Sequence, residues 1–341
     1  MKPDDLRRVF DQVKPDPKRE NALLARLLAG EGTEKTGMKA KRMPRLTTVA
    51  VAAALLVTCA FAAVATGLDQ RIINYFGATA EQEELLSSAA LPVKIKVTDR
   101  GSTLQVRQVI ADRYSVVILM DFTAPEGAVL DGSCYVLGDT VEAVAPNGSR
   151  MQGCGIDWEL LEDGEPEDNH ISLLFTVYSL YGNFDFLGAK LSLTFEGLYH
   201  DAGQTECLAA GRWGCKITLP TEDSGRCYTP NQPVDIGGRS VTLISVYLSP
   251  ITFAFDLEAG GDDLRVVGEF LNGDDLRENL VLTAADGREI EVGACRFLSI
   301  QTSMGQGRCC FQLAVITDPA EVTSVTLFGR TFSLAGSIVQ D

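Results

Sequence analysis

Apolar and polar residues alternate with a period of two along most of the chain after Pro92. Val93, Ile95 and Val97, for example, alternate with two lysines. The same alternation recurs in three later segments, at Leu191, Leu193 and Phe195, at Ile251, Phe253, Phe255 and Leu257, and at Phe311, Leu313 and Val315. Turn-forming pairs such as Asn147-Gly148 and Gly237-Gly238 fall between such segments. Short alternating strands separated by turns are typical of antiparallel, Ig-like β-sandwiches.

A weak internal repeat indicates that this β-rich part contains two related domains. Three segment pairs occur in the same order, with Asp121 matching Asp256 at an offset of 135 residues. The turn at Asn147-Gly148 matches Asp286-Gly287 at an offset of 139, and residues 193–197 match 325–329 at an offset of 132. We therefore predict two tandem sandwiches, at 91–219 and 226–337, joined by a polar linker. Chance similarity between β-patterned segments is the alternative.

The N-terminal 45 residues follow a helical period instead. Apolar residues at helical spacing form a first stripe that Pro15 ends, and a leucine face follows between Pro17 and Gly30. The two stripes consist of Leu6, Val9, Phe10 and Val13, and of Leu23, Leu24, Leu27 and Leu28. Two helices this short are not stable alone, so their stripes must pack on each other as a hairpin beside the membrane, on the bilayer, or on a cytoplasmic partner. No His/Cys pattern for a zinc-type module is present in this head.

Residues 46–68 contain no charged side chain and separate two differently charged regions. As a helix they would measure about 34 Å, enough for a hydrocarbon core of about 30 Å. Residues 1–45 hold 12 Lys and Arg against 7 Asp and Glu, whereas the remaining residues hold 18 against 39. The positive-inside rule then predicts a single-pass membrane protein with a cytoplasmic N-terminus and extracytoplasmic C-terminal domains. A signal peptide cleaved after Ala65, or a lipoprotein with Cys59 as its lipidated residue, are alternatives.

Residues 69–90 have helical character. Ile72, Ile73 and Phe76 share a face, and Thr79 with Gln82 fits a capping box. We predict a helical stalk between membrane and sandwiches, with Tyr75 and Phe76 able to pack on the following domain. The predicted fold is thus a helical head (1–45), one transmembrane helix (46–68), a helical stalk (69–90) and two antiparallel β-sandwiches.

The composition argues against several functional classes. A net charge of −16 in 341 residues is unlike a nucleic-acid-binding protein, which needs a basic face. His170 and His200 are the only histidines, and neither has a nucleophile and a carboxylate at recognisable spacing. Phosphate-binding loops and dinucleotide fingerprints are also missing from the sequence. We therefore expect neither an enzyme, a cofactor nor a metal site, and we interpret acidic clusters such as Asp262-Asp263 as solvated turns.

Eight of the nine cysteines follow the uncharged segment, four in each predicted sandwich. An even number per domain outside the cytoplasm suggests disulfides, although four cysteines allow three connectivities. Cys207 and Cys215 bracket a short loop and are our first predicted pair, followed by Cys134 with Cys154. Reduced, buried thiols are the alternative.

The layout of the chain resembles a known group of proteins. A helical head with Asp4-Asp5-Leu6 near its start, a basic stretch, one uncharged segment and residues 71–76 in an outer helix carry this resemblance. It is strongest from Leu46 to Gly127, and the group consists of Firmicute single-pass membrane proteins with an extracytoplasmic domain of unknown function. Members are often regarded as anti-sigma-factor-like. The resemblance implies that the head binds a sigma factor while the outer domains sense an unknown signal. The alternative is a surface-anchored binding or adhesion module without a cytoplasmic partner.

Overall fold

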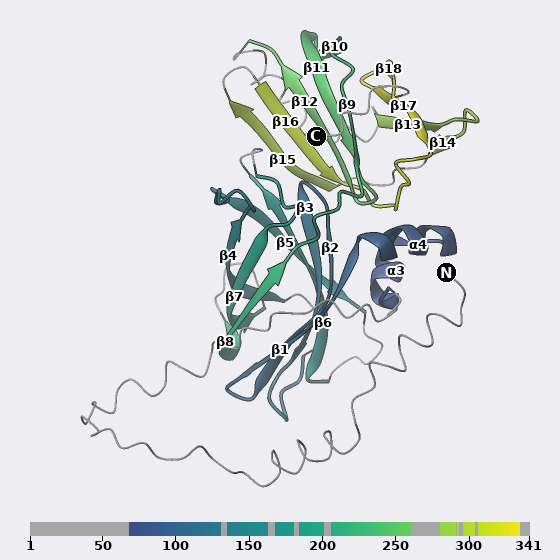
Figure 1. Ribbon diagram of the computed structural model, residues 1–341. Coiled ribbons are helices and arrows are strands. Elements are labelled where there is room, and N and C mark those ends of the chain that lie inside the picture. Colours follow the sequence, from purple (N-terminus) through teal and green to yellow (C-terminus); the bar gives the residue numbers. More distant parts are fainter. Residues whose placement is uncertain are drawn as a thin grey trace, which may run out of the picture. The chain divides into compact units, whose positions relative to one another are not determined.

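The computed structural model describes residues 68–130, 135–162, 168–180, 184–200, 206–260, 263, 267, 280–290, 292, 296–303 and 306–334. All of these residues belong to one compact unit. They are mainly β-strand, with two short helices at the start and the strands in four antiparallel sheets (Figure 1). The predicted head, residues 1–45, lies outside the described residues, as do residues 46–67.

The two helices begin and end where the sequence places capping residues. Helix α3 (Gln70–Phe76) has Asp69 as its N-cap and ends at Gly77, whose left-handed conformation favours glycine. Helix α4 (Ala80–Ala89) begins with the predicted capping box of Thr79 and Gln82. The local chemistry of these helices is therefore readable from the sequence.

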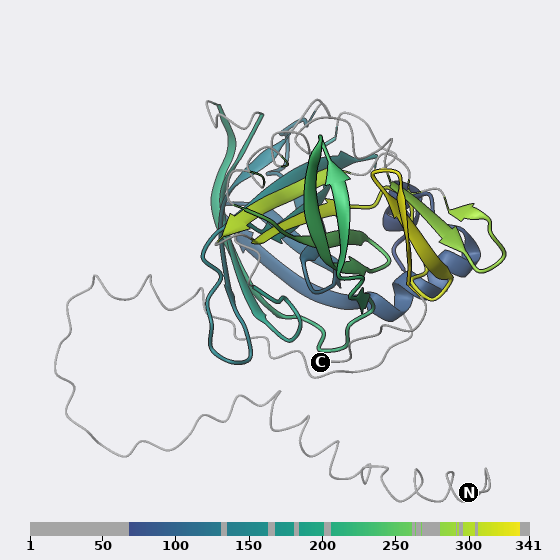
Figure 2. The ribbon, with the colours of Figure 1, turned by 90° about the horizontal axis from the view of Figure 1, so that it is seen from above.

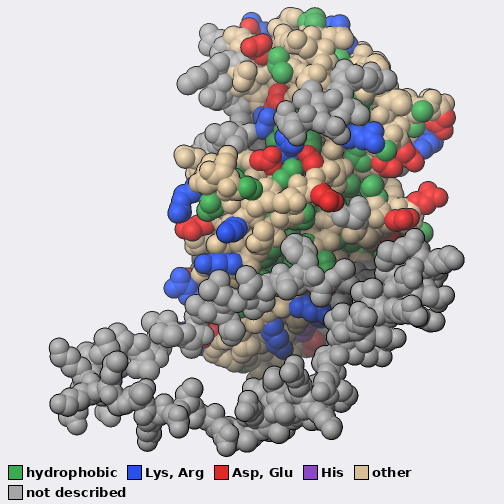
Figure 3. All heavy atoms as spheres, viewed as in Figure 1, with side chains coloured by type: hydrophobic (Ala, Val, Ile, Leu, Met, Phe, Trp, Pro, Cys, Tyr) green, Lys and Arg blue, Asp and Glu red, His purple; other side chains and the backbone are tan. Residues whose placement is uncertain are grey.

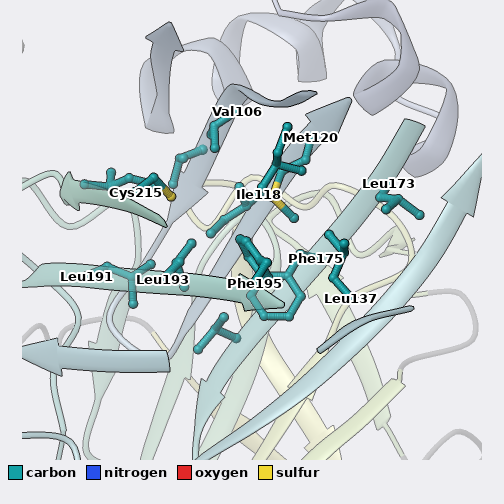
Figure 4. Packing of buried hydrophobic residues seen from close by; sticks show 14 of the residues in the cluster. Val106, Ile118, Met120, Leu137, Leu173, Phe175, Leu191, Leu193, Phe195 and Cys215 are labelled. Carbon is teal, nitrogen blue, oxygen red and sulfur yellow. The ribbon is translucent and has the colours of Figure 1, made fainter. Parts of the chain in front are cut away.

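The first eight strands form two sheets, which we call the first module. The strands are β1 (Ala90–Asp99), β2 (Ser102–Ala111), β3 (Ser115–Thr123), β4 (Val136–Val144), β5 (Cys154–Leu161), β6 (His170–Ser179), β7 (Lys190–Tyr199) and β8 (Cys207–Thr218). One sheet has the order β1-β2-β3-β6-β5 and the other β4-β7-β8. The inner faces of both sheets contribute to one buried cluster. Figure 4 shows part of it, with Phe175 of one sheet beside Phe195 of the other.

The remaining strands form the second module. They are β9 (Arg226–Tyr228), β10 (Gln232–Ile236), β11 (Arg239–Leu248), β12 (Thr252–Glu258), β13 (Leu280–Ala284), β14 (Glu289–Ile290), β15 (Arg296–Ser303), β16 (Gln306–Gln312), β17 (Val322–Leu327) and β18 (Arg330–Ser333). Their sheets have the orders β10-β11-β12-β16-β15, with β9 also paired to β11, and β14-β13-β17-β18. A second buried cluster lies between these sheets. Figure 2 shows the module from above.

The two modules repeat one strand order. The pairing β1-β2-β3-β6-β5 corresponds to β10-β11-β12-β16-β15, and β4-β7-β8 corresponds to β13-β17-β18. Even an irregularity repeats, because β2 and β3 shift register between Val106 and Gln108, while β11 and β12 shift between Leu243 and Ser245. These matches support the internal repeat that the sequence suggests.

The predicted fold class is wrong in its helical parts. Helices α3 and α4 do not form a stalk, because Ile72, Phe76, Leu86 and Ala89 are buried in one cluster with strand residues. In Figures 1 and 2 both helices lie against the strands. Among the residues that the structure describes, none of the helices has the length and apolar character to cross a membrane. An apolar helix stripe requires a partner surface, and here that surface is the β-sheet.

Candidate functional site

The predicted docking residues cannot be placed, because all eight, Leu6, Val9, Phe10, Val13, Leu23, Leu24, Leu27 and Leu28, lie outside the described residues. Their role stays a prediction. The structure instead concentrates buried polar groups where the first and second modules meet, which we call the junction. We describe the junction as the candidate functional site.

The predicted Cys207–Cys215 disulfide is wrong. Both residues belong to strand β8 and both are free thiols. Eight residues of extended chain span roughly 25 Å, whereas bridged cysteines have Cα atoms within about 7 Å. Cys154 is also a free thiol, and its predicted partner Cys134 lies outside the described residues. Burial raises the pKa of the Cys215 thiol to about 12, which makes it unreactive.

The junction is built from two equivalent hairpin turns. In the β2–β3 turn, the backbone amide of Asp112 donates to the carbonyl of Ser115 at 3.0 Å. In the β11–β12 turn, the backbone amide of Ser249 donates to the carbonyl of Thr252 at 2.8 Å. In each turn the side chain of the first residue also accepts a hydrogen bond from the backbone amide of the last residue. The distances from Ser115 N to Asp112 Oδ1 and from Thr252 N to Ser249 Oγ are both 2.8 Å. Asp112 and Ser249 are 137 positions apart, as are Ser115 and Thr252. The turns therefore occupy the same place in the two repeats.

These equivalent turns bind each other directly. The Ser249 hydroxyl donates to Asp112 Oδ2 at 2.6 Å, and the hydroxyls of Ser115 and Thr252 are 2.8 Å apart. All four residues have no exposed surface. Contact between the same elements of two repeats is the arrangement of a two-fold dimer interface. The junction is thus self-complementary within one chain.

Apolar packing across the junction follows the same symmetry. Ile251, in the second module's turn, is buried beside Ile110 and Val117 of the first. Tyr114, the equivalent residue of the first turn, packs on Tyr247 and Ala254 of the second module. Tyr114 meets the Tyr247 ring edge-on at 4.8 Å, a favourable aromatic geometry.

The segment between the modules is fixed by both of them. Asp223, in the predicted polar linker, accepts hydrogen bonds from Arg113 of the first module at 3.1 Å and from Tyr247 of the second at 2.7 Å. Arg113 also faces Asp185 at 3.7 Å. Because one linker carboxylate binds both modules, it helps to fix the geometry of the junction.

Helices α3 and α4 extend the junction on one side. Their buried residues share a cluster with Leu119 of the first module and with Ile251 and Ile316 of the second. Gln82 of α4 donates to the Ile316 carbonyl at 2.6 Å. The helices therefore contact both modules at once.

Arg71 fixes helix α3 to the first sheet. Its guanidinium pairs with Asp121, which is 5% exposed, and with the N-cap Asp69 at 2.8 Å. Arg107 also pairs with Asp121. The hydrogen bond from Arg71 holds the pKa of Asp69 below its usual value. Among the described residues, no group of three His, Cys, Asp or Glu side chains is placed to hold a metal ion.

One visible face of the molecule carries interspersed acidic, basic and hydrophobic side chains (Figure 3). His170 lies 4.0 Å from Asp121, and His200 stacks on Tyr135.

Comparison with known proteins adds little to this description. No family model matches the chain, and no curated protein matches it. Among solved structures, it is similar to one titled "The crystal structure of the conserved domain protein from Bacillus anthracis". That match has a TM-score of 0.49 at 12% identity and covers 70% of this chain and 77% of the other.

The junction residues are not evident from the sequence. Asp112 and Ser249 differ in charge, and the repeat seen in the sequence aligns Asp121 with Asp256 instead. A search for Asx- and Ser-type turns at one constant offset would have found both turns.

Proposed function

We propose that the described part of the chain is the sensing end of a membrane-bound, non-enzymatic regulator of the anti-sigma type. The observation that carries this proposal is the shared burial of α3 and α4 with residues of both modules. These helices come directly after the N-terminal segment in the chain. A ligand that changes the junction would alter their packing, and so change the start of the segment that leads to residues 1–45.

The proposed cytoplasmic partner is a sigma factor held by the two apolar stripes of the head. The test uses the full chain, coexpressed with a sigma factor and recovered by a C-terminal tag. Phe10→Asp or Leu24→Asp should weaken sigma-factor binding by more than about 2 kcal/mol, because charge replaces a buried anchor. Gln12→Asp, off the apolar stripe, is the matched control and should bind like the wild type. Equal recovery with Phe10→Asp and Gln12→Asp would contradict docking through this stripe.

The alternative is a surface-anchored binding module whose N-terminal segment has no signalling role. The ion pair between Arg71 and Asp121 favours this alternative, because it fixes α3 to the first sheet. The Arg71→Ala variant separates the two functions, because it loosens α3 without changing residues 1–45. A regulator should show altered sigma-dependent transcription at equal protein level. Unchanged transcription in Arg71→Ala would favour the binding module.

A further inference from the structure

Asp112 is a fully buried carboxylate at the centre of the junction. Oδ1 accepts the backbone amides of Tyr114 and Ser115 at 2.8 Å each, and Oδ2 accepts the Ser249 hydroxyl at 2.6 Å. The side chain of Asp112 has no exposed surface. Its equivalent in the second module, Ser249, caps its own turn as a neutral group. The shared turn therefore does not require a charge at this position.

Asp112 differs from Asp121, the other buried aspartate among the described residues, because Asp121 pairs with two cations, Arg71 and Arg107. Asp256, which is 25% exposed, pairs with Arg308. None of the ion pairs found among the described residues involves Asp112. A buried carboxylate without a cation has only its hydrogen-bond donors to offset the desolvation cost of ionisation.

The titratable groups around Asp112 do not compensate for this charge. Tyr247 and Cys310 face it from β11 and β16, and burial raises the pKa of both above the ordinary range. Both are therefore neutral near neutral pH. Arg113 directs its guanidinium to Asp223 and Asp185 instead.

The surrounding hydroxyls can serve both protonation states. The Thr252 hydroxyl contacts Asp112, and the hydrogen bond between Thr252 and Ser115 can run in either direction. With Asp112 ionised, Thr252 donates to the carboxylate. With Asp112 protonated, the carboxyl donates to Thr252 Oγ1, and Thr252 donates to Ser115. The proton is thus accommodated by rotating two hydroxyls, without moving the backbone.

We propose that the junction is a proton-binding joint, in which Asp112 takes up a proton from solvent water as the two modules close on each other. This goes beyond the proposed regulatory function and does not depend on it. Burial raises the pKa of Asp112, while the hydroxyl and amide donors oppose the rise. A group whose pKa is raised on folding contributes stability that is fully present below its unfolded pKa. That contribution is lost as pH rises through the folded-state pKa. The closed junction is therefore favoured by acid.

The test compares full-length wild type with Asp112→Asn by urea unfolding between about pH 4 and pH 8. Asparagine keeps the size of the side chain and an oxygen for the turn amides, but it cannot ionise. Stability of the wild type relative to Asp112→Asn should fall as pH rises. The ratio of the two folding constants should change by up to about tenfold per pH unit between the unfolded and folded pKa values. Asp69→Asn is the matched control. Because Arg71 lowers the pKa of Asp69, the stability of the wild type relative to this variant should rise with pH only at the acid end of the range and stay constant above about pH 5.

A constant ratio of folding constants across this pH range, or one that rises with pH, would overturn the proposal. If Asp112→Asn fails to fold, the wild type is titrated by carbon-13 NMR of its aspartate carboxyls. Burial also raises the pKa of Asp139, so the Asp112 carboxyl is identified as the one that titrates above the usual aspartate range and whose resonance shifts in Ser249→Ala. The absence of such a carboxyl would overturn the proposal equally.

Discussion

One cross-strand pair of residues differs in kind between the two modules. Leu119 of β3 lies opposite Leu174 of β6 in the first module, and at the equivalent position of the second module Asp256 of β12 lies opposite Arg308 of β16. Both leucines are at most 2% exposed, because helices α3 and α4 cover them. Asp256 and Arg308 are each 25% exposed. One fold thus carries an apolar pair where a helix covers the sheet and an ion pair where the position meets solvent.

Each version is consistent with its surroundings. Arg308 contacts Asp256 at 2.6 and 2.9 Å and lies over the Tyr114 ring at 4.5 Å, while Ser245 donates to the same carboxylate at 2.6 Å. The first module has its carboxylate two residues further on, at Asp121, and its cations are Arg71 of α3 and Arg107 of β2. The difference teaches that the helices are part of the first module's packing, although they precede its first strand.

The largest loss of stability is expected when Leu119, which α3 and α4 cover, is replaced by the aspartate found at the equivalent position of the second module. Leu119→Asp should lower the free energy of unfolding by about 4 kcal/mol, because a buried charge then lacks a partner. Urea unfolding measures this loss. Adding Leu174→Arg supplies the ion pair and should recover part of it. A loss below about 1 kcal/mol for Leu119→Asp would mean that α3 and α4 do not cover this position.

A smaller effect is expected from breaking the ion pair in the second module. Arg308→Leu should cost about 2 kcal/mol, because Asp256 then keeps only its serine donor and Tyr114 loses its cation. The double variant Asp256→Leu/Arg308→Leu reproduces the apolar pair of the first module and should cost less than Arg308→Leu alone. Strictly additive costs in this double-mutant cycle would show that the two side chains are not coupled.

Thiol labelling is expected to leave the stability of the protein unchanged and to distinguish cysteines buried in the core from a cysteine exposed at the end of a strand. Cys309 lies on the core face where the first module has Phe175, and both are fully buried. Cys207 is exposed at the start of β8. Alkylation of never-reduced, folded protein should modify Cys207 rapidly, and Cys215 and Cys309 only after denaturant is added. A mass two hydrogens lower, located to a peptide linking Cys207 and Cys215, would restore the disulfide and contradict the strand.

Local chemistry was predictable from the sequence, whereas strand register was not. The turns at Asn147-Gly148 and Asp286-Gly287 have identical backbone hydrogen bonds, so the predicted offset of 139 is correct. The hairpin itself repeats at an offset of 137, so Asp256 matches Leu119 and not Asp121. A shift of two residues returns every side chain to the same face of a strand. The alternation of apolar and polar residues therefore cannot detect a shift of two residues. A turn can, because each of its positions requires a particular residue type.

The prediction of a helical stalk is wrong for a related reason. The sequence correctly placed Ile72, Ile73 and Phe76 on one face of a helix, and all three are buried. Periodicity shows that such a face needs a partner but does not identify it. The partner residues include Val117 and Ile251, which are far apart in the sequence and come together only when both modules are folded.

The central claim is that the modules are two versions of one unit that meet through equivalent turns. Exchanging the first residues of the turns tests this most directly, with the free energy of unfolding measured for full-length variants. Ser249→Asp alone should cost several kcal/mol, because it places a second carboxylate against buried Asp112. The exchange Asp112→Ser/Ser249→Asp restores one carboxylate and one hydroxyl, and it should lie within about 1 kcal/mol of the wild type. If the exchanged protein is as unstable as Ser249→Asp, the two turns are not equivalent.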